Sequence, residues 1–307
     1  MNDFRKSPPE PLAPVAFDIP RPHTATLDNG LRVVVFENAR LPLVSYRLAF
    51  FAGDIHDPKG STGLTSALAA QIAEGTENYT SLQLADKVER LGASLHASAS
   101  DDFTILSASA LSLYSSEVLD LMVEVLLRPT FSEDELDLYR RNTVEHLKFQ
   151  RSQPPFLAAE QASRLLYGKH PYAVISPNAA DIEKLDREVL AKFHAANLVP
   201  NNAMFVVVGD VESDKFIAEL NDHLGGWHLG EARSHSFAEP PTRDKRTLTI
   251  VDRPGSAQSN IVMTNTAIKR TDPDYFKVIV MNQVLGAGAS SRVFMNLREE
   301  KGYTYGA

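Results

Sequence analysis

The chain has 307 residues, of which 43% are hydrophobic, and this length is sufficient for two domains, each with a core of its own. The net charge is −8, with Lys and Arg scattered along the chain. This balance argues against a nucleic-acid partner, because phosphate binding requires a concentrated positive surface. Cysteine is absent, which excludes thiolate zinc sites, disulfides and a cysteine nucleophile but leaves the compartment open.

Residues 1–22 are rich in proline and charge and predict an extended leader. They do not have the apolar run of a signal peptide, and no run in the chain reaches the roughly 18 apolar residues of a membrane helix. We therefore expect no membrane insertion. The chain as written is expected to be cytoplasmic, or periplasmic if a signal peptide has been removed.

Residues 23–225 predict a first domain of strands and helices. The dipeptide Asn29-Gly30 is typical of a tight hairpin between two strands within Thr24–Val35. Thr80 and Gln83 have the spacing of a capping box for a helix that ends at Gly92. Apolar periodicity predicts the other elements: strands at 43–51, 94–99, 103–110 and 205–208, and helices at 62–74, around 118–125, and at 133–150, 157–166, 187–195 and 215–224. Ser132 and Glu135 are expected to cap the long helix, and the strand 205–208 is expected to be fully buried.

Residues 226–245 predict a linker, after which the opening pattern starts again over 246–307. Strands are predicted at Thr247–Val251 and Asn260–Thr264. A helix follows Thr271-Asp272-Pro273, with Val278, Ile279 and Leu285 on its core side, and another helix ends near Glu300. The repeated order predicts an α+β fold with duplicated domains, the second copy truncated. The chain ends inside a predicted strand, so we expect further residues beyond 307.

Several short motifs follow one another in the order and spacing of the pitrilysin, insulinase and mitochondrial-processing-peptidase family. The chain resembles this family from about Thr24 to Ala307. The motifs are Gly63-Leu64 and Glu74-Gly75-Thr76 around the first helix, His170-Pro171-Tyr172, Pro200-Asn201-Asn202, Val208-Gly209-Asp210, and Leu297-Arg298-Glu299-Glu300-Lys301-Gly302 continuing to Tyr305. Each motif is weak alone, but their common order is specific. The resemblance implies duplicated insulinase-like domains, each an antiparallel-rich sheet packed against helices.

The zinc motif of that family, His-x-x-Glu-His, corresponds to Ser66, Ala69 and Ala70 in this sequence. The motif places two histidine ligands on one helical face, with a glutamate that activates a zinc-bound water. Serine is a poor zinc ligand and alanine has no donor atom, so these positions cannot form the site. The family's third ligand corresponds to His146. We expect this lone histidine to be structural or solvated, beside a surface Glu145.

The resemblance also implies a role for Arg298 and Tyr305. Their spacing of seven residues matches an Arg and a Tyr that the second domain of the family directs toward the substrate backbone. A guanidinium and a phenol are suitable donors to a scissile carbonyl oxygen as negative charge develops on it. The alternative is that Arg298 pairs with a nearby carboxylate and Tyr305 is an ordinary strand residue.

We therefore predict a non-catalytic partner subunit of a heteromeric zinc metallopeptidase, inactive alone, that helps to enclose and bind unfolded peptide substrates. It holds no cofactor itself, and the zinc is expected in a homologous peptidase subunit, to whose site Arg298 and Tyr305 contribute. A homodimer is the other assembly considered. The alternative function is a structural or peptide-binding scaffold with no role in catalysis. An active enzyme with an unrecognised site is disfavoured, because no histidine pair has i, i+4 spacing on a predicted helix.

Overall fold

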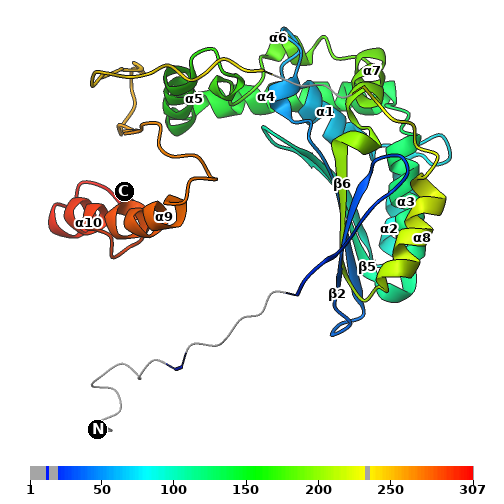
Figure 1. Cartoon of the computed structure of the whole chain (residues 1–307). Helices are drawn as coiled ribbons and strands as arrows, with labels where there is room; N and C mark the ends of the chain where they lie inside the picture. The colour runs from blue at the N-terminus through cyan, green and yellow to red at the C-terminus, as the bar shows by residue number, and fades with distance from the viewer. Residues whose placement is uncertain (1–11, 14–19, 232–235, 307) are drawn as a thin grey trace, which may run out of the picture. The chain divides into compact units, whose positions relative to one another are not determined.

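The computed structural model describes residues 12–13, 20–231 and 236–306. The chain divides into two compact units, Met1–Asn260 and Ile261–Ala307. The first contains a sheet with helices and the second is described as helices and loops, which confirms the predicted α+β class (Figure 1). The predicted segments 1–22, 23–225, 226–245 and 246–307 stay a prediction. Within the described ranges, no helix is both long enough and apolar enough to cross a membrane.

The first unit is built on one six-stranded sheet with the order β1-β2-β6-β3-β5-β4. The strands are β1 His23–Thr26, β2 Arg32–Glu37, β3 Leu43–Phe50, β4 Ser94–Ala99, β5 Thr104–Leu111 and β6 Ala203–Gly209. Neighbouring strands are antiparallel except β2 and β6, which are parallel. The edges of the sheet are β1 and β4. The strands predicted between residues 23 and 225 are confirmed.

The predicted hairpin between β1 and β2 is confirmed, and its turn is fixed to a distant helix. Gly30 has a φ of +80°, a conformation that glycine adopts without strain. The buried Asn29 side chain accepts a hydrogen bond from the Leu31 N–H at 3.1 Å and donates one to the Leu224 carbonyl at 2.6 Å. Leu224 is the last residue of α8 (Ser213–Leu224), so the Asn29 amide joins the start of the sheet to the end of that helix.

Helices cover one face of the sheet. They are α2 (Ser81–Arg90), α3 (Ser115–Leu127) and α8, which contact β4, β5 and β2 (Figure 1). Strand side chains that point toward these helices, such as Tyr46, Leu48 and Leu106, are almost fully buried. Those of the opposite face are exposed or half-buried, except for the buried Ser107, and we call it the open face. The predicted full burial of β6 is wrong: Val208 on the open face is 41% exposed, because helices pack against one side only.

Five further helices gather beyond one end of the sheet (Figure 1): α1 (Leu64–Gln71), α4 (Glu133–Ser152), α5 (Pro154–Tyr167), α6 (Ala179–Ile182) and α7 (Arg187–Asn197). Short 3₁₀ turns join the elements at Asp54–His56, Ser112–Tyr114, Pro171–Ala173 and Pro200–Asn202. Helix α1 contacts α4, α7 and β4. It therefore lies between the helices and the edge of the sheet.

The two predicted helix caps have different outcomes. The capping box of α2 is confirmed, since the Gln83 N–H donates to the Thr80 hydroxyl at 3.3 Å and the Thr80 N–H donates to Gln83 Oε1 at 3.0 Å. The cap of α4 by Ser132 is wrong, because its side chain accepts no capping hydrogen bond. Glu135 instead accepts a hydrogen bond from the Ser81 hydroxyl at 2.6 Å, so a tertiary contact replaces the local one.

The predicted strands at Thr247–Val251 and Asn260–Thr264 are wrong. Both segments are extended without strand pairing, and Leu248 and Met263 are 88% and 93% exposed. An extended segment becomes a strand only where a neighbouring strand satisfies its N–H and C=O groups. Among the described residues no strand pairs with either segment.

The second unit contains the two predicted helices of the sequence repeat. They are α9 (Tyr275–Asn282), which continues as a π-helical turn at Gln283–Ala287, and α10 (Arg292–Phe294), which continues as a π-helical segment at Met295–Glu300. The expected core side of α9 is not buried: Val278 is half-buried, and Ile279 and Leu285 are about half exposed.

Replacement of Asn29 by Ala is expected to lower the free energy of unfolding by about 2 kcal/mol, because it leaves the Leu31 N–H and the Leu224 carbonyl without their partner. Urea unfolding followed by circular dichroism measures the change. Asn38→Ala is the matched control, since Asn38 is exposed and accepts a hydrogen bond only within its own turn. An Asn29→Ala variant as stable as Asn38→Ala would contradict this role.

Candidate functional site

The start of helix α1 is fixed by a carboxylate from outside the helix. Asp57 Oδ2 accepts a hydrogen bond from the Gly63 N–H at 2.6 Å. Its Oδ1 accepts from the Thr65 N–H at 2.9 Å and from the Thr65 hydroxyl at 2.6 Å. These bonds satisfy N–H groups that a helix start leaves without partners. A negative charge is also favourable at the positive end of the helix dipole.

Glycine is required at position 63, the first residue of the Gly63-Leu64 motif. Its φ is +89°, and a Cβ atom there would lie 2.8 Å from the Pro177 side chain. The preceding Thr62 hydroxyl donates to Asp181 of α6 at 2.7 Å, and this bond holds the pKa of Asp181 below its ordinary value. The motif thus has a packing explanation that is independent of catalysis.

The residues at the family's zinc positions do not fit a zinc ion. The Ser66 hydroxyl donates to the two carboxylate oxygens of Asp54 at 3.0 and 3.1 Å. Ala69 is buried and Ala70 is exposed, and neither has a donor atom. His146 is exposed on α4. In the part of the chain that the structure describes, no three His, Cys, Asp or Glu side chains are grouped so as to hold a metal ion.

Two half-buried aspartates, Asp54 and Asp57, accept hydrogen bonds from the first turns of α1. Burial raises the pKa of Asp57 to about 6, against the lowering effect of its hydrogen bonds from Thr65 and Gly63. Burial also raises the pKa of Asp54, and the negative charge of Asp101 adds to that effect. Tyr139 of α4 lies near both aspartates, and burial raises the pKa of its phenol. The degenerate zinc motif on α1 therefore lies beside two hydrogen-bonded acidic side chains, Asp54 and Asp57.

The sequence analysis did not predict the contacts that Asp54 and Asp57 make with α1. A capping box joins two residues that are three positions apart. Asp57 instead accepts hydrogen bonds from N–H groups six and eight residues later in the chain. The Asp57-Pro58 dipeptide signalled only a loop. The useful signal was the combination of an aspartate in that loop with Gly63 and Thr65 at the helix start.

The loop that carries these aspartates is also bonded to the hairpin between β4 and β5. The Asp54 N–H donates to the Ser100 carbonyl at 2.9 Å, and the Ile55 N–H donates to the Asp101 carbonyl at 3.0 Å. The Tyr172 hydroxyl donates to Asp102 at 2.7 Å, which raises the pKa of Tyr172 to about 12. The emptied motif is thereby placed beside the edge strand β4.

Edge strand β4 presents backbone groups that the sheet does not use. The Ser100 N–H donates to the Phe103 carbonyl at 2.8 Å and closes the hairpin. Since bonded and non-bonded pairs alternate in an antiparallel ladder, Leu95, Ala97 and Ala99 direct their N–H and C=O groups away from β5. An extended peptide could therefore add to β4 as a seventh strand.

Arg298 and Tyr305 are brought together within the second unit. Arg298 Nη1 donates to the backbone carbonyl of Tyr305 at 2.8 Å, and the guanidinium lies 5.2 Å from the ring centre of Phe294. Arg298 Nε also lies 3.4 Å from Glu299, the nearby carboxylate of the alternative interpretation. The Tyr305 side chain is 86% exposed, so its phenol is accessible to a ligand.

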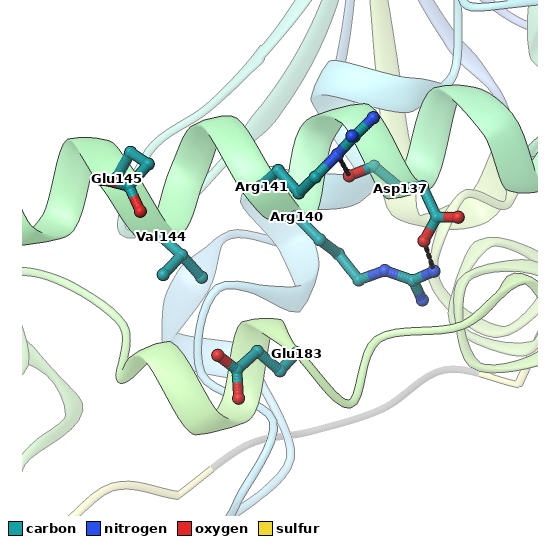
Figure 2. A pocket seen from close by; sticks show the side chains of 6 residues that line it. All are labelled: Asp137, Arg140, Arg141, Val144, Glu145 and Glu183. Carbon is teal, nitrogen blue, oxygen red and sulfur yellow. Dashed lines mark hydrogen bonds and ion pairs between the residues drawn. The ribbon is translucent and has the colours of Figure 1, made fainter.

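A shallow pocket of about 390 Å³ lies along α4 and is not a site of this kind (Figure 2). Several of the charged side chains that line it already have partners. Arg140 donates to Asp137, to Glu133 and to the Leu185 carbonyl. Glu145 forms an ion pair with Lys148 at 2.6 Å, as expected for a surface residue. Arg140 therefore joins α4 to the segment after α6.

Asp57 is expected to make stability fall as pH rises. Its pKa is about 6 in the folded chain and near 3.8 in the unfolded chain, so the unfolded state loses this proton first. Its contribution is fully present below about pH 4 and is lost through about pH 6, a change of about 3 kcal/mol. Asp57→Asn should flatten the stability profile from pH 4 to 7, measured by urea unfolding. Asp222→Asn, which removes an exposed carboxylate, is the control; equal profiles for the two variants would contradict the assignment.

Two family models match the sequence. The model of the insulinase family (peptidase family M16) matches residues 32–174, and that of the peptidase M16 inactive domain matches residues 184–307. The uncharacterized zinc protease YmxG of Bacillus subtilis is 23% identical over 287 residues, covering 91% of this chain and 68% of YmxG. The non-peptidase homolog YmxG of Helicobacter pylori is 25% identical over 274 residues, covering 89% of this chain and 63% of that protein.

Solved structures agree with the sequence matches. The crystal structure of a peptidase M16 inactive domain from Pseudomonas fluorescens is similar with a TM-score of 0.79 and 27% identity, covering 93% of this chain and 69% of that one. The matched regions include the helix with Ser66 as well as the segment with Arg298. The chain therefore belongs to the insulinase family of peptidases, family M16.

Proposed function

We propose that this chain is a non-catalytic subunit that binds unfolded peptides together with a homologous, zinc-bearing peptidase subunit. The observation that carries the proposal is the replacement of the zinc motif by Ser66, Ala69 and Ala70, with Ser66 bonded to Asp54. Zinc hydrolases need nitrogen, sulfur or carboxylate ligands and a general base on this helix, and these residues supply none of them. The catalytic metal belongs to the partner subunit under this proposal.

The sheet edge beside the emptied motif supports peptide binding. Loss of the metal ligands leaves the backbone groups of β4 intact, because strand addition uses N–H and C=O groups and not particular side chains. Four of the six side chains of β4 are Ser or Ala, and all six are exposed or half-buried. A chain without its own zinc can thus still hold an extended substrate.

Arg298 and Tyr305 are the residues that we assign to the shared reaction. Both are donors, and their contact within one segment keeps them together. Directed at a substrate carbonyl in the partner's site, they would stabilise the negative charge that develops on its oxygen. The non-peptidase homolog of Helicobacter pylori and the inactive domain of Pseudomonas fluorescens, both relatives of this chain, support a role that does not need its own catalytic centre.

A scaffold with no role in catalysis is the second candidate. It is favoured by the contacts that Arg298 already makes, to the Tyr305 carbonyl, to Glu299 and to the Phe294 ring. These contacts are sufficient to explain the arginine as a residue that folds the C-terminal segment. The two candidates differ in what the loss of Arg298 does to a rate.

Arg298→Ala is expected to lower kcat/KM about a hundredfold in a complex with the His-x-x-Glu-His homologue, because one donor to the developing oxyanion is lost. Cleavage of a fluorogenic unfolded peptide measures the rate. Arg292→Ala, in the same helical segment and also exposed, is the control. If both variants keep the full rate and assemble normally, the scaffold function is the correct one.

Ala97→Pro is expected to weaken peptide binding by this chain about tenfold, because proline removes the edge N–H that a guest strand would use. Ala97→Val keeps that N–H and should bind normally. Fluorescence anisotropy of a labelled unfolded peptide measures affinity, and thermal unfolding checks that both variants fold. Equal binding by the proline and valine variants would rule out the β4 edge as the peptide site.

A further inference from the structure

The open face of the sheet changes character from one side to the other. On β2 and β6 it carries half-buried apolar side chains such as Val34 and Val206. On β5 and β4 it carries Ile105 and Leu111 at the ends of β5, and four small polar side chains: Ser94, Ser98, Ser107 and Ser109. The face nearest the peptide-binding edge can therefore form hydrogen bonds with a guest side chain.

Arg47 places a positive charge on this polar part. It lies on the open face of β3, in register with Ser107 of β5, which is in turn in register with His96 of β4. Arg47 Nη1 donates to the Ser107 hydroxyl at 3.4 Å, and Ser107 is only 6% exposed. The guanidinium thus extends across β5 in the direction of the edge.

The charge of Arg47 has no acidic partner in the described part of the chain. Its recorded polar contact is the Ser107 hydroxyl, and no carboxylate forms an ion pair with it. In a chain of net charge −8, an exposed arginine so placed is available to an acidic group from outside. A charged donor forms stronger hydrogen bonds with a carboxylate than a hydroxyl does.

A guest strand would bring its side chains to this charge. It would lie about 4.8 Å beyond β4, with alternate side chains on the open face. The guest side chain opposite His96 would lie next to the imidazole of His96, and the guanidinium of Arg47 would lie on the far side of that imidazole. At the other end of β4 the charge reverses, since Asp101 and Asp102 form the tip of the hairpin. A guest carboxylate is therefore favoured at the His96 row and disfavoured at the tip.

We infer that the β4 edge selects extended peptides that place an acidic side chain on the open face, opposite His96 and toward Arg47. This inference rests on the proposed binding of peptides at β4 and adds a preference among them. Arg47 and His96 are specificity residues in it, whereas the backbone of β4 supplies sequence-independent affinity.

The test uses the full chain and three labelled twelve-residue unfolded peptides that differ only at two alternate positions, which are Glu, Gln or Lys. Anisotropy titrations at low salt should give about fivefold tighter binding of the Glu peptide than of the Gln peptide, and weaker binding of the Lys peptide. Arg47→Gln should reduce the preference, and Arg47→Gln with His96→Gln should remove it, while affinity for the Gln peptide is kept.

Two controls separate the charge from the fold. Arg47→Lys retains the charge and should retain most of the preference. Arg32→Gln removes an arginine on the same face that lies over the Phe51 ring at 5.4 Å, far from β4 in the strand order, and should leave the preference unchanged. Thermal unfolding confirms that each variant is folded.

The outcomes distinguish this inference from the function on which it rests. Equal affinity of the wild-type chain for the Glu and Gln peptides overturns the acidic preference and leaves edge binding intact. A preference that survives in the double variant also overturns it. Failure of the wild-type chain to bind any of the three peptides overturns peptide binding at β4 itself, and the preference with it.

Discussion

The carboxylate of Asp57 accepts three hydrogen bonds at the start of α1, and much of the site's geometry depends on them. The same loop is bonded to the tip of the β4–β5 hairpin, and Thr62 joins the helix start to α6. One loop therefore sets the position of the helix that carries the degenerate motif relative to the edge strand. This arrangement needs no metal ion.

The charge of the site is reversed compared with a metal centre. A zinc ion is a concentrated positive charge held by its ligands. Here Asp54 and Asp57 supply negative charge that is partly buried and is balanced by hydrogen bonds from Ser66, Thr65 and Gly63. Burial raises the pKa of both carboxyl groups, because the charged form of each is less favourable there than in water. Positive charge appears instead on the open face, at Arg47.

The sequence predicted the strands and helices of the first unit because each has a local signal, such as Asn29-Gly30 or the capping box of Thr80 and Gln83. The predictions from sequence were wrong where an element depends on contacts with residues that are distant in the chain. The segments 247–251 and 260–264 have strand-like composition but lack paired strands, and Ser132 has the spacing of a cap that its side chain does not make. Val208 is exposed because no helix packs on its side of the sheet. The hydrophobic pattern within the strand does not indicate which face of the sheet the helices cover.

The candidate site was predictable only in part, for the same reason. Motif order located Ser66, Ala69, Ala70 and Arg298, because these are positions in a linear pattern. The bonds from Ser66 to Asp54 and from Arg47 to Ser107 join residues 12 and 60 positions apart, so no local pattern reports them. The Arg298 contact with Tyr305 is the intermediate case, since its seven-residue spacing is visible but its geometry is not.

The order of strands also constrains how the first unit folds. Strand β6 lies between β2 and β3 in the sheet, although it follows both by more than 150 residues in the sequence. The β1–β2 and β4–β5 hairpins can form from nearby residues, and β3 pairs with β5 before β6 is synthesised or afterwards, but the sheet closes only when β6 enters between β2 and β3. Until then β2 and β3 both present unpaired edges to other chains, and closing so long a loop is slow. Protection of these two edges during synthesis is therefore a requirement of this topology, and the Asn29 contact with Leu224 can form only after the gap is filled.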